Sequence, residues 1–288
     1  FDTIMEVFGR GAEASAQAAQ SRQIKVKGDF HSLAGAAVLL VEDNEINQQV
    51  AMEILKQVGI SVTVAENGQA AVELAAKHTF DAVLMDIQMP VMDGYTATGK
   101  MREMQNASPP QAPYAPIIAM TAHAVSGERE KCLAAGMDEY VSKPIDPDFL
   151  YSVLLKWIRP GGGEAAAAAP PLAASSRGKD SDACPLDALE GFDAAAGLKR
   201  VGGNRQLYRS LLLAFHDQYA GVSEKLGEYV ANGAYTDARA LVHEVKGVAG
   251  NLSAVALHRA AKALEAGLKT ENAPVGEDLL SDFNGALE

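Results

Sequence analysis

Polar side chains suited to phosphate chemistry stand directly after short apolar runs of the sequence. They are Glu42, Asp43, Asp86, Thr121 and Lys143. Three carboxylates brought together repel one another. A hard divalent cation such as Mg²⁺ relieves that repulsion, because it takes oxygen ligands and keeps waters for a phosphate. A lysine adds a fixed positive charge and a threonine adds a hydroxyl donor, so the set suits the transfer of a phosphoryl group.

One of these carboxylates could itself be the nucleophile and form an acyl phosphate. Asp86 is the best candidate, because it stands alone at the end of the apolar run 82–85. That run is expected to be the central strand of a sheet.

The elements that must position these groups alternate between strand and helix along residues 37–158. The expected strands are 37–41, 60–65, 82–85, 116–120 and 139–142, and the expected helices are 44–58, 69–77, one ending near 104, 126–135 and 146–158. Five such units predict a parallel sheet with helices on both faces. Ligands of open α/β sheets bind beyond the carboxyl ends of the strands, where the polar residues stand.

Four blocks of this region resemble the signature of the response-regulator receiver domain. They read LLVEDNEINQQVA, VLMDIQMPVMDG, IIAMTAHA and DEYVSKPI, in the family's order and spacing. The resemblance implies a flavodoxin-like fold. It also implies a site for Mg²⁺ (or Mn²⁺) held by Glu42, Asp43, Asp86 and the backbone carbonyl of Gln88.

The same resemblance implies roles for the remaining residues. Asp86 is the expected phosphoacceptor, Thr121 would hydrogen-bond the phosphoryl group, and Lys143 would pair with it. Tyr140 matches the aromatic position that swings inward when the threonine moves toward the phosphate, which makes it the expected switch residue. The Lys143–Pro144 bond is often cis in this family.

Residues 186–288 show no strand pattern. Helix-length segments near 204–219, 222–230, 234–254, 257–268 and 276–287 predict a helical bundle. In the third segment an apolar stripe at helical spacing is expected to face the core: Leu241, Val245, Val248 and Leu252. His243 points about 200° away from Leu241 and is expected to be exposed.

The surroundings of His243 are unusual for a solvated histidine. Within about 60° of it on the helical wheel lie Arg239, Lys246, Gly247 and Gly250. Each glycine inside a helix costs about 1 kcal/mol relative to alanine, so folding alone does not favour two of them. Their expected use is to let another protein approach the imidazole, while the cations offset charge on a phosphoryl group.

The run HEVKGVAGNLSA resembles the histidine-phosphotransfer (HPt) domain, a four-helix bundle that carries phosphate on one histidine; residues 191–212 look like the opening of that domain. The resemblance implies His243 as phosphoacceptor, supported by Lys246 and Gly247. Receiver plus HPt resembles the C-terminal part of a hybrid sensor histidine kinase. The implied relay runs from an upstream kinase core of the same parent chain to Asp86, then to His243, then to a separate response regulator.

Composition divides the chain into five segments. The expected order is the last helix of a preceding receiver (1–10), a linker (11–36), the receiver (37–158), an Ala/Gly/Pro-rich linker (159–185) and the HPt domain (186–288). If flexible, the 23 residues 161–183 within this linker span roughly 25–30 Å, so they allow the two domains to meet without forcing them to. We further expect the helix carrying Ile46 and Val50 to pack beside the His243 helix.

Charge and composition exclude several other classes. With 25 Lys and Arg against 37 Asp and Glu, the net charge of −12 argues against nucleic-acid binding. Apolar runs are too short to cross a membrane, although the parent could be anchored in the inner membrane. Two lone cysteines, Cys132 and Cys184, fit a reducing cytoplasm. Neither a glycine-rich ATP lid nor a kinase dimerisation helix is found, so this fragment is not expected to use ATP by itself.

Two other functions remain open at this stage. In the first, the receiver is an interaction module that controls an attached kinase by docking, and the HPt is charged by another donor. In the second, the chain is a metal-dependent hydrolase with an aspartyl nucleophile. The hydrolase is disfavoured, because such enzymes normally carry a second acid two residues after the nucleophile, where this chain has Gln88.

Overall fold

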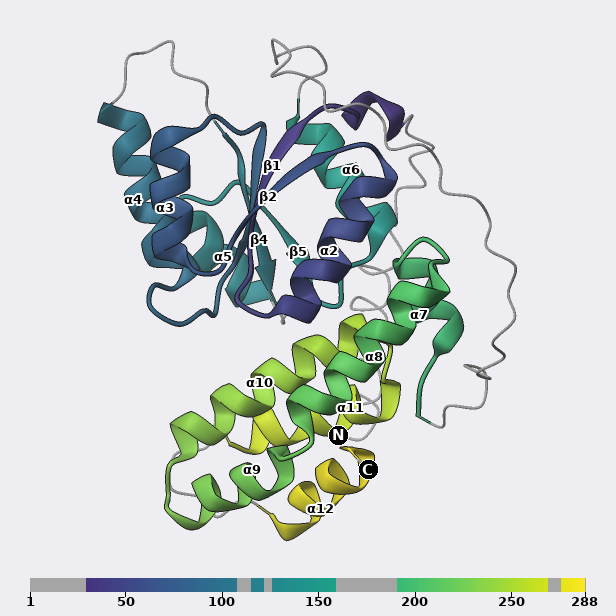
Figure 1. The fold of residues 1–288 in the computed structure, drawn as a ribbon. Coiled ribbons are helices and arrows are strands. Elements are labelled where there is room, and N and C mark those ends of the chain that lie inside the picture. The colour runs from purple at the N-terminus through teal and green to yellow at the C-terminus, as the bar shows by residue number, and fades with distance from the viewer. Residues whose placement is uncertain (1–29, 108–114, 122–125, 159–190, 269–275, 288) are drawn as a thin grey trace, which may run out of the picture.

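The computed structural model describes residues 30–107, 115–121, 126–158, 191–268 and 276–287. Within these ranges the chain forms an α/β part and an all-helical part that lie against each other (Figure 1). The predicted preceding helix (1–10), most of the linker 11–36 and all of the linker 159–185 lie outside the described residues. The bounds of the five segments therefore stay predictions.

Five parallel strands form one sheet in the order β2-β1-β3-β4-β5. They are β1 (Ala37–Val41), β2 (Ser61–Ala65), β3 (Ala82–Asp86), β4 (Ile117–Thr121) and β5 (Glu139–Ser142). Every residue of β3 and β4 is buried, as expected for strands covered on both faces. The order of the strands reverses at β1 and β3, and the crevice beyond their carboxyl ends is where such sheets bind ligands.

Helices cover both faces of the sheet, as predicted. One face carries α2 (Glu45–Gln57) and α6 (Pro147–Trp157), and the other carries α3 (Gly68–Lys77), α4 (Gly94–Ala107) and α5 (Ser126–Ala134) (Figure 1). Successive strand residues point to opposite faces. Accordingly Val38 and Leu40 belong to one core, and Leu39 and Val41 to the other. Inside the predicted linker 11–36, the 3-10 turn η1 (Phe30–Leu33) packs against α6.

The C-terminal part consists, in its described residues, of helices joined by short turns, and an isolated β-bridge pairs Phe192 with Ala254. Its helices are α7 (Ala194–Arg200), α8 (Arg205–Tyr219), α9 (Val222–Ala231), α10 (Tyr235–Asn251), α11 (Val255–Gly267) and α12 (Glu277–Leu287). The long α10 contacts α9 and α11, and α11 contacts α12, which makes a bundle. The sequence did not predict α7, because seven residues are too few to show a helical period. Among the described helices, none is long and apolar enough to cross a membrane.

The two parts meet along α2, which contacts both α8 and α10. This confirms the predicted packing of α2 beside the His243 helix. Ile46 and Val50 are buried, with 2% and 0% of their surfaces exposed. Buried apolar side chains of both parts belong to one contiguous cluster. The interface is thus an extension of the hydrophobic core, which stabilises the arrangement of the two parts.

The start of α4 lies unusually close to the end of β3. The Gly94 N–H donates to the Ile87 carbonyl at 2.9 Å. A Cβ at position 94 would lie 2.1 Å from the carbonyl oxygen of Asp86. Glycine at this position therefore allows α4 to begin directly against Asp86.

Gly94→Ala is expected to lower the free energy of unfolding by at least about 2 kcal/mol, because the backbone must shift to admit the methyl group. Gly99→Ala is the matched control in the same helix, since no atom lies within 4 Å of a Cβ there. It should stabilise the chain by up to about 1 kcal/mol. Urea unfolding followed by circular dichroism measures both changes, and equal effects of the two substitutions would contradict this account.

Candidate functional site

The three predicted carboxylates come together beyond the ends of β1 and β3. Ligand oxygens of Glu42, Asp43 and Asp86 all lie within 4.8 Å of one another. Glu42 and Asp86 are buried, with 2% and 6% of their surfaces exposed. Hard oxygen donors at this spacing fit a divalent cation such as Mg²⁺.

Lys143 joins two of these carboxylates. Its Nζ lies 2.6 Å from Glu42 Oε2 and 2.7 Å from Asp86 Oδ2, with the lysine side chain 6% exposed. Burial disfavours the charged ammonium, but the charges of Asp86 and Glu42 outweigh burial and raise the pKa of Lys143 above its ordinary value. The lysine therefore stays charged and offsets part of the negative charge of the cluster.

Glu42 and Asp43 resist ionisation, because Lys143 does not fully offset the effect of burial and neighbouring negative charge. Burial, together with the charge of Asp86, raises the pKa of Glu42 to about 7 even though Lys143 opposes the shift. Burial and the charge of Asp86 also raise the pKa of Asp43 to about 6. Both groups bind protons more readily in the folded chain, so their ionisation costs a folding free energy that grows as pH rises from their ordinary pKa values, 4.5 and 3.8, to these raised ones. A bound cation would relieve that cost.

The other predicted residues of the α/β part lie at or near this site. Thr121 ends β4, is 4% exposed and lines the same cleft as Asp86 and Lys143, as does Gln88. Tyr140 lies in β5, where it packs partly buried against the core under α3 and α4 and is not among the residues that line the cleft. The Lys143–Pro144 bond is cis, as the resemblance implied.

The second predicted phosphoacceptor, His243, lies on α10 with 20% of its side chain exposed. Its Nδ1–H donates to Glu265 Oε1 at 2.8 Å. The second oxygen of Glu265 accepts from Lys246 Nζ, and both of these side chains are almost wholly buried. Donation by Nδ1 leaves the other ring nitrogen, Nε2, with its lone pair available.

Two predictions about this helix are wrong. His243 is not an exposed residue, because only 20% of its side chain is accessible beside Glu265. Lys246 does flank the imidazole, with its Nζ 3.5 Å from His243 Nδ1, but it is buried and paired with Glu265. Leu241 is only partly buried, and Val242 takes the core position instead, with 0% exposed. The other three residues of the predicted stripe are buried: Val245, Val248 and Leu252. Arg239 does line the cleft.

Both glycines leave space: the α/β part lies beside Gly247, as predicted, whereas at Gly250 the ring of His258 in the bundle lies nearer than the α/β part. A Cβ at Gly247 would lie 3.7 Å from Asn47 Nδ2, and one at Gly250 would lie 3.3 Å from Pro144 Cβ. The Gly250 position also faces the ring of His258, at 2.9 Å. The absence of side chains thus allows α10 to approach the elements that carry the acidic cluster.

Sequence reasoning missed Glu265 entirely. It lies on α11, 22 residues after His243, and no spacing rule within one helix connects the two. Burial raises the pKa of a carboxyl, but hydrogen bonds from His243 and Lys246 outweigh burial and lower the pKa of Glu265 to about 2. Glu265 is therefore ionised at neutral pH, where it balances the charge of Lys246 and accepts the hydrogen bond of His243.

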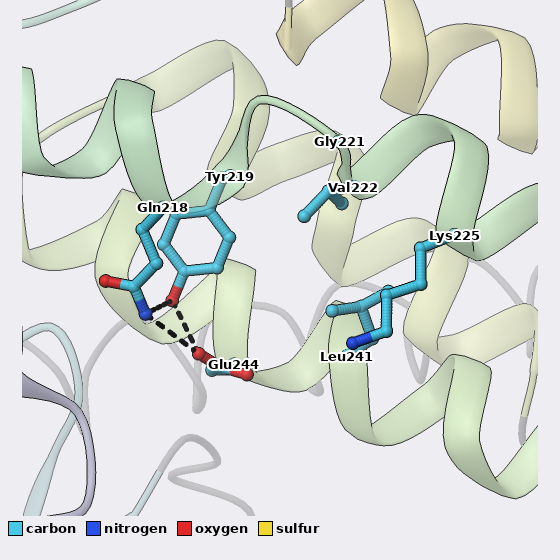
Figure 2. A pocket seen from close by; sticks show the side chains of 7 residues that line it. All are labelled: Gln218, Tyr219, Gly221, Val222, Lys225, Leu241 and Glu244. Atoms are coloured by element: carbon cyan, nitrogen blue, oxygen red, sulfur yellow. Dashed lines mark hydrogen bonds between the residues drawn. The ribbon is translucent and has the colours of Figure 1, made fainter.

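Asp86 and His243 open into one cleft of about 1400 Å³ between the two parts of the chain. Its walls include the acidic cluster and Lys143 on one side and His243, Gly247 and Glu265 on the other. Two groups able to carry a phosphoryl group therefore face the same space. A second, smaller cleft of about 270 Å³ lies between α8 and α10, beside Tyr219 and Glu244 (Figure 2).

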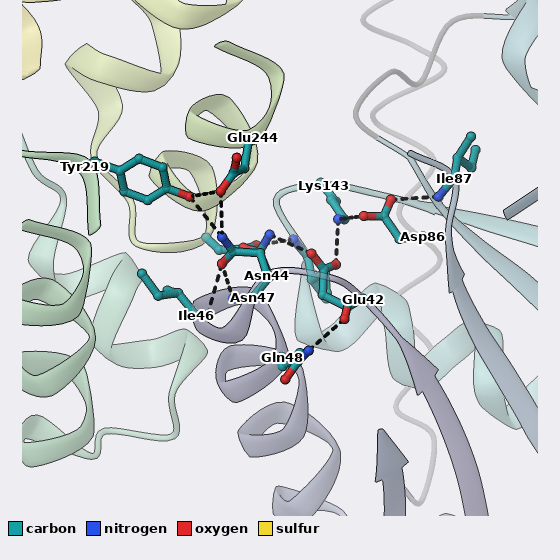
Figure 3. Close-up of polar contacts among 12 residues, drawn as sticks. Glu42, Asn44, Ile46, Asn47, Gln48, Asp86, Ile87, Lys143, Tyr219 and Glu244 are labelled. Carbon is teal, nitrogen blue, oxygen red and sulfur yellow. Dashed lines mark hydrogen bonds and ion pairs between the residues drawn. The ribbon is translucent and has the colours of Figure 1, made fainter. Parts of the chain in front are cut away.

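Hydrogen bonds continue from the acidic cluster across the interface (Figure 3). Glu42 Oε1 accepts from Asn47 Nδ2 at 2.9 Å, and Asn47 Oδ1 accepts from Asn251 Nδ2 at 2.8 Å. Asn251 Oδ1 in turn accepts from the Ile145 N–H at 3.2 Å. Arg200 of the bundle also bonds across the interface, because its Nε donates to the Ile145 carbonyl at 3.0 Å. The two parts are thus held by buried polar contacts as well as by the apolar core.

The fold and the site define a doubly wound α/β domain with an acidic, lysine-containing cleft, docked on a helical bundle that presents a histidine. Residues 38–155 match the family model of the response regulator receiver domain. This part of the chain belongs to that family, and the chain is accordingly a protein of two-component signal transduction.

Relatives extend the match beyond the receiver. The sensor protein GacS of Pseudomonas syringae pv. syringae is 34% identical over 256 residues, which cover 87% of this chain and 26% of GacS. The signal transduction histidine-protein kinase BarA of Escherichia coli K12 is 30% identical over 213 residues, 74% of this chain and 22% of BarA. The chain therefore spans about a quarter of the length of these relatives.

Among solved structures, the receiver domain of the sensor histidine kinase PA1611 from Pseudomonas aeruginosa PAO1 is 44% identical. The match covers 43% of this chain and 98% of the PA1611 domain, with a TM-score of 0.39. The PA1611 domain was crystallised with magnesium in its active site cleft. Because this TM-score is low, the family assignment rests on the sequence match.

Glu265→Gln is expected to lower the free energy of unfolding at pH 7 by about 3 kcal/mol, since a carboxyl whose pKa falls to about 2 stabilises the fold when ionised. The stabilisation is present above the ordinary pKa of 4.5 and is lost as pH falls toward 2. The difference between wild type and variant should therefore shrink below pH 4.5, as urea unfolding at several pH values would measure.

The matched control is Glu228→Gln, an exposed glutamate on α9. It should change the stability by less than about 0.5 kcal/mol at any of these pH values. A difference for Glu265→Gln that stays constant from pH 7 to pH 3 would contradict the assigned ion pairs.

Proposed function

We propose that the chain is a phosphorelay intermediate that moves a phosphoryl group from Asp86 to His243. The observation that carries the proposal is the shared cleft, into which both residues open. Of the three histidines in the bundle, only His243 lines this cleft. Among the described residues the cluster of three acids lies in the receiver and not beside His243, which suits an acceptor that relies on the receiver for catalysis. We accordingly interpret the bundle as an HPt domain.

In the first step, an Asp86 oxygen forms a P–O bond while the P–N bond of an upstream phosphohistidine breaks, and the electron pair returns to the departing imidazole. Glu42, Asp43, Asp86 and the carbonyl of Gln88 would hold Mg²⁺, with Mn²⁺ as a substitute; the bound cation neutralises charge on the phosphoryl oxygens. Lys143, already charged at Asp86, would pair with the phosphoryl group.

In the second step, His243 Nε2 attacks phosphorus and the P–O bond to Asp86 breaks, which restores the carboxylate. The imidazole ring becomes cationic when Nε2 is phosphorylated, because Nδ1 keeps its proton. Glu265 accepts that proton in a hydrogen bond of 2.8 Å and stabilises the positive ring. Lys246 holds Glu265 in place, and Gly247 keeps the approach to the ring open.

Thr121 and Tyr140 are proposed to couple the phosphoryl group to the shape of the receiver. The Thr121 hydroxyl would hydrogen-bond a phosphoryl oxygen and move toward it. Tyr140, only partly buried on the neighbouring strand β5, would move inward into the space that the threonine leaves. This is a local charge that biases a two-state element.

The proposed partners follow from the relay. Upstream, a histidine kinase core of the same parent chain would supply phosphohistidine; downstream, the receiver of a separate response regulator would accept the phosphoryl group from His243. A relay fed by an ATP-dependent kinase core would operate in the cytoplasm. No nucleic-acid partner is proposed, given the net charge of −12.

The docked arrangement also favours a second candidate, in which the receiver is a regulatory interaction module and His243 is charged by another donor. Buried contacts such as Asn47–Asn251 would then serve regulation rather than transfer. The two candidates differ in whether phosphate on His243 depends on Asp86.

The test is intact-mass analysis of the full chain after addition of Mg²⁺ and a small acyl-phosphate donor. Wild type should carry an acid-labile phosphoryl group on His243. Asp86→Asn should carry none, and His243→Gln should trap a base-labile acyl phosphate on Asp86. Phosphate on His243 in Asp86→Asn would favour the interaction module. No adduct in any version, with Mg²⁺ binding confirmed, would contradict the relay.

A further inference from the structure

Asn44 performs two tasks with one side-chain amide. Its Oδ1 caps α2 by accepting from the N–H groups of Ile46 and Asn47, at 3.0 and 3.2 Å. This fixes the orientation of the amide, so its Nδ2 must face the helical bundle. There it donates to Tyr219 Oη at 2.9 Å and to Glu244 Oε1 at 3.2 Å (Figure 3).

The helical bundle presents hydrogen-bond acceptors to the side-chain amide of Asn44. Glu244 Oε1 accepts from Tyr219 Oη at 2.8 Å and from Gln218 Nε2 at 3.3 Å (Figure 2). It also accepts from Asn44. Burial, and then the charge of Glu244, raise the pKa of Tyr219, so its hydroxyl stays protonated and can donate to Glu244 while it accepts from Asn44. Asn44 and Tyr219 are 5% and 3% exposed.

The contact joins the two reacting centres. Asn44 directly follows the acidic pair Glu42 and Asp43, and Glu244 directly follows His243 in the chain. A bond between positions 44 and 244 therefore fixes how the acidic cluster lies against the imidazole. It is well suited to distinguish one docked receiver from another.

We propose that Tyr219 and Glu244 select, as partners for His243, those receivers whose residue after the acidic pair donates a hydrogen bond. The chain's own receiver qualifies through Asn44, and a downstream receiver that uses the same helix face must present a donor at the matching position. The selection deepens the proposed function, since it names the chemistry of the partners of that same site.

Physical chemistry explains the selectivity. An aspartate at position 44 would keep the helix cap, because aspartate and asparagine are equally good N-caps. It would offer no donor and would set a second carboxylate against Glu244 in a buried place, where unpaired charges are costly. Receivers with an acidic residue at that position are therefore excluded by repulsion as well as by the missing bond.

The Ile145 amide measures docking directly, because it donates to Asn251 across the interface and is 2% exposed. The experiment compares its hydrogen-exchange rate, by NMR, in the full unphosphorylated chain without metal. The versions are wild type, Asn44→Asp, Glu244→Gln and the double variant. The Val83 amide, which bonds to Pro116 within the α/β part, reports whether that part stays folded.

Asn44→Asp should speed exchange at Ile145 by about tenfold or more, since a hydrogen bond to a charged group is lost. Glu244→Gln alone should change it by less than about threefold, because its amide oxygen still accepts. The double variant should return to within about threefold of wild type, as the glutamine donates to the new aspartate. The control Gln49→Glu adds the same charge at an exposed position of α2 and should change exchange by less than about twofold.

Two results would overturn the proposal. One is an Asn44→Asp chain whose Ile145 exchange is no faster than that of Gln49→Glu. The other is a double variant that is not restored. Because no phosphate is present, a chain that behaves as expected here and yet never moves phosphate from Asp86 to His243 would contradict only the relay.

Discussion

The charge of Lys143 is the condition on which the rest of the site depends. Without a cation, Glu42, Asp43 and Asp86 could not all ionise within 4.8 Å of one another in a largely buried place. The ammonium holds Glu42 and Asp86 at 2.6 and 2.7 Å. Burial and the remaining repulsion by Asp86 are not fully compensated, and they raise the pKa values of Glu42 and Asp43. This uncompensated negative charge is what favours binding of a divalent cation.

The same charge balance positions the bundle. One oxygen of Glu42 binds Lys143, and the other orients the amide of Asn47, whose oxygen is then available to Asn251. The amides of Asn47 and Asn251 each present a donor to one side and an acceptor to the other, so reversing either would leave a buried polar group without a partner. The state of the acidic cluster is therefore connected to the docking of α10.

The helical bundle contains a second buried ion pair beside a proposed phosphoacceptor. Glu265 lies between His243 and Lys246, and its carboxylate compensates a buried lysine while it fixes the tautomer of the histidine. The chain thus supplies each of the two proposed phosphoacceptors with a buried counter-charge. At Asp86 the counter-charge is positive and suits an incoming phosphoryl group; at His243 it is negative and suits the cationic ring of a phosphohistidine.

Sequence reasoning predicted what local patterns encode. Apolar runs ending in polar residues gave the strands and brought Glu42, Asp43, Asp86 and Lys143 to one edge, because the parallel topology leaves no other arrangement. The packing of α2 beside α10 was also predicted. Local patterns carry no information about side chains that meet from distant segments. Glu265 and the burial of Lys246 were therefore missed, as was the asparagine pair across the interface.

The central claim is that Asp86 and His243 react within one docked molecule. The most direct measurement is the rate at which His243 gains phosphate from Asp86 in a single turnover, over a hundredfold range of protein concentration. Transfer within one chain predicts a first-order rate constant that does not change with concentration. A rate that rises in proportion to concentration would show transfer between molecules and would contradict the account.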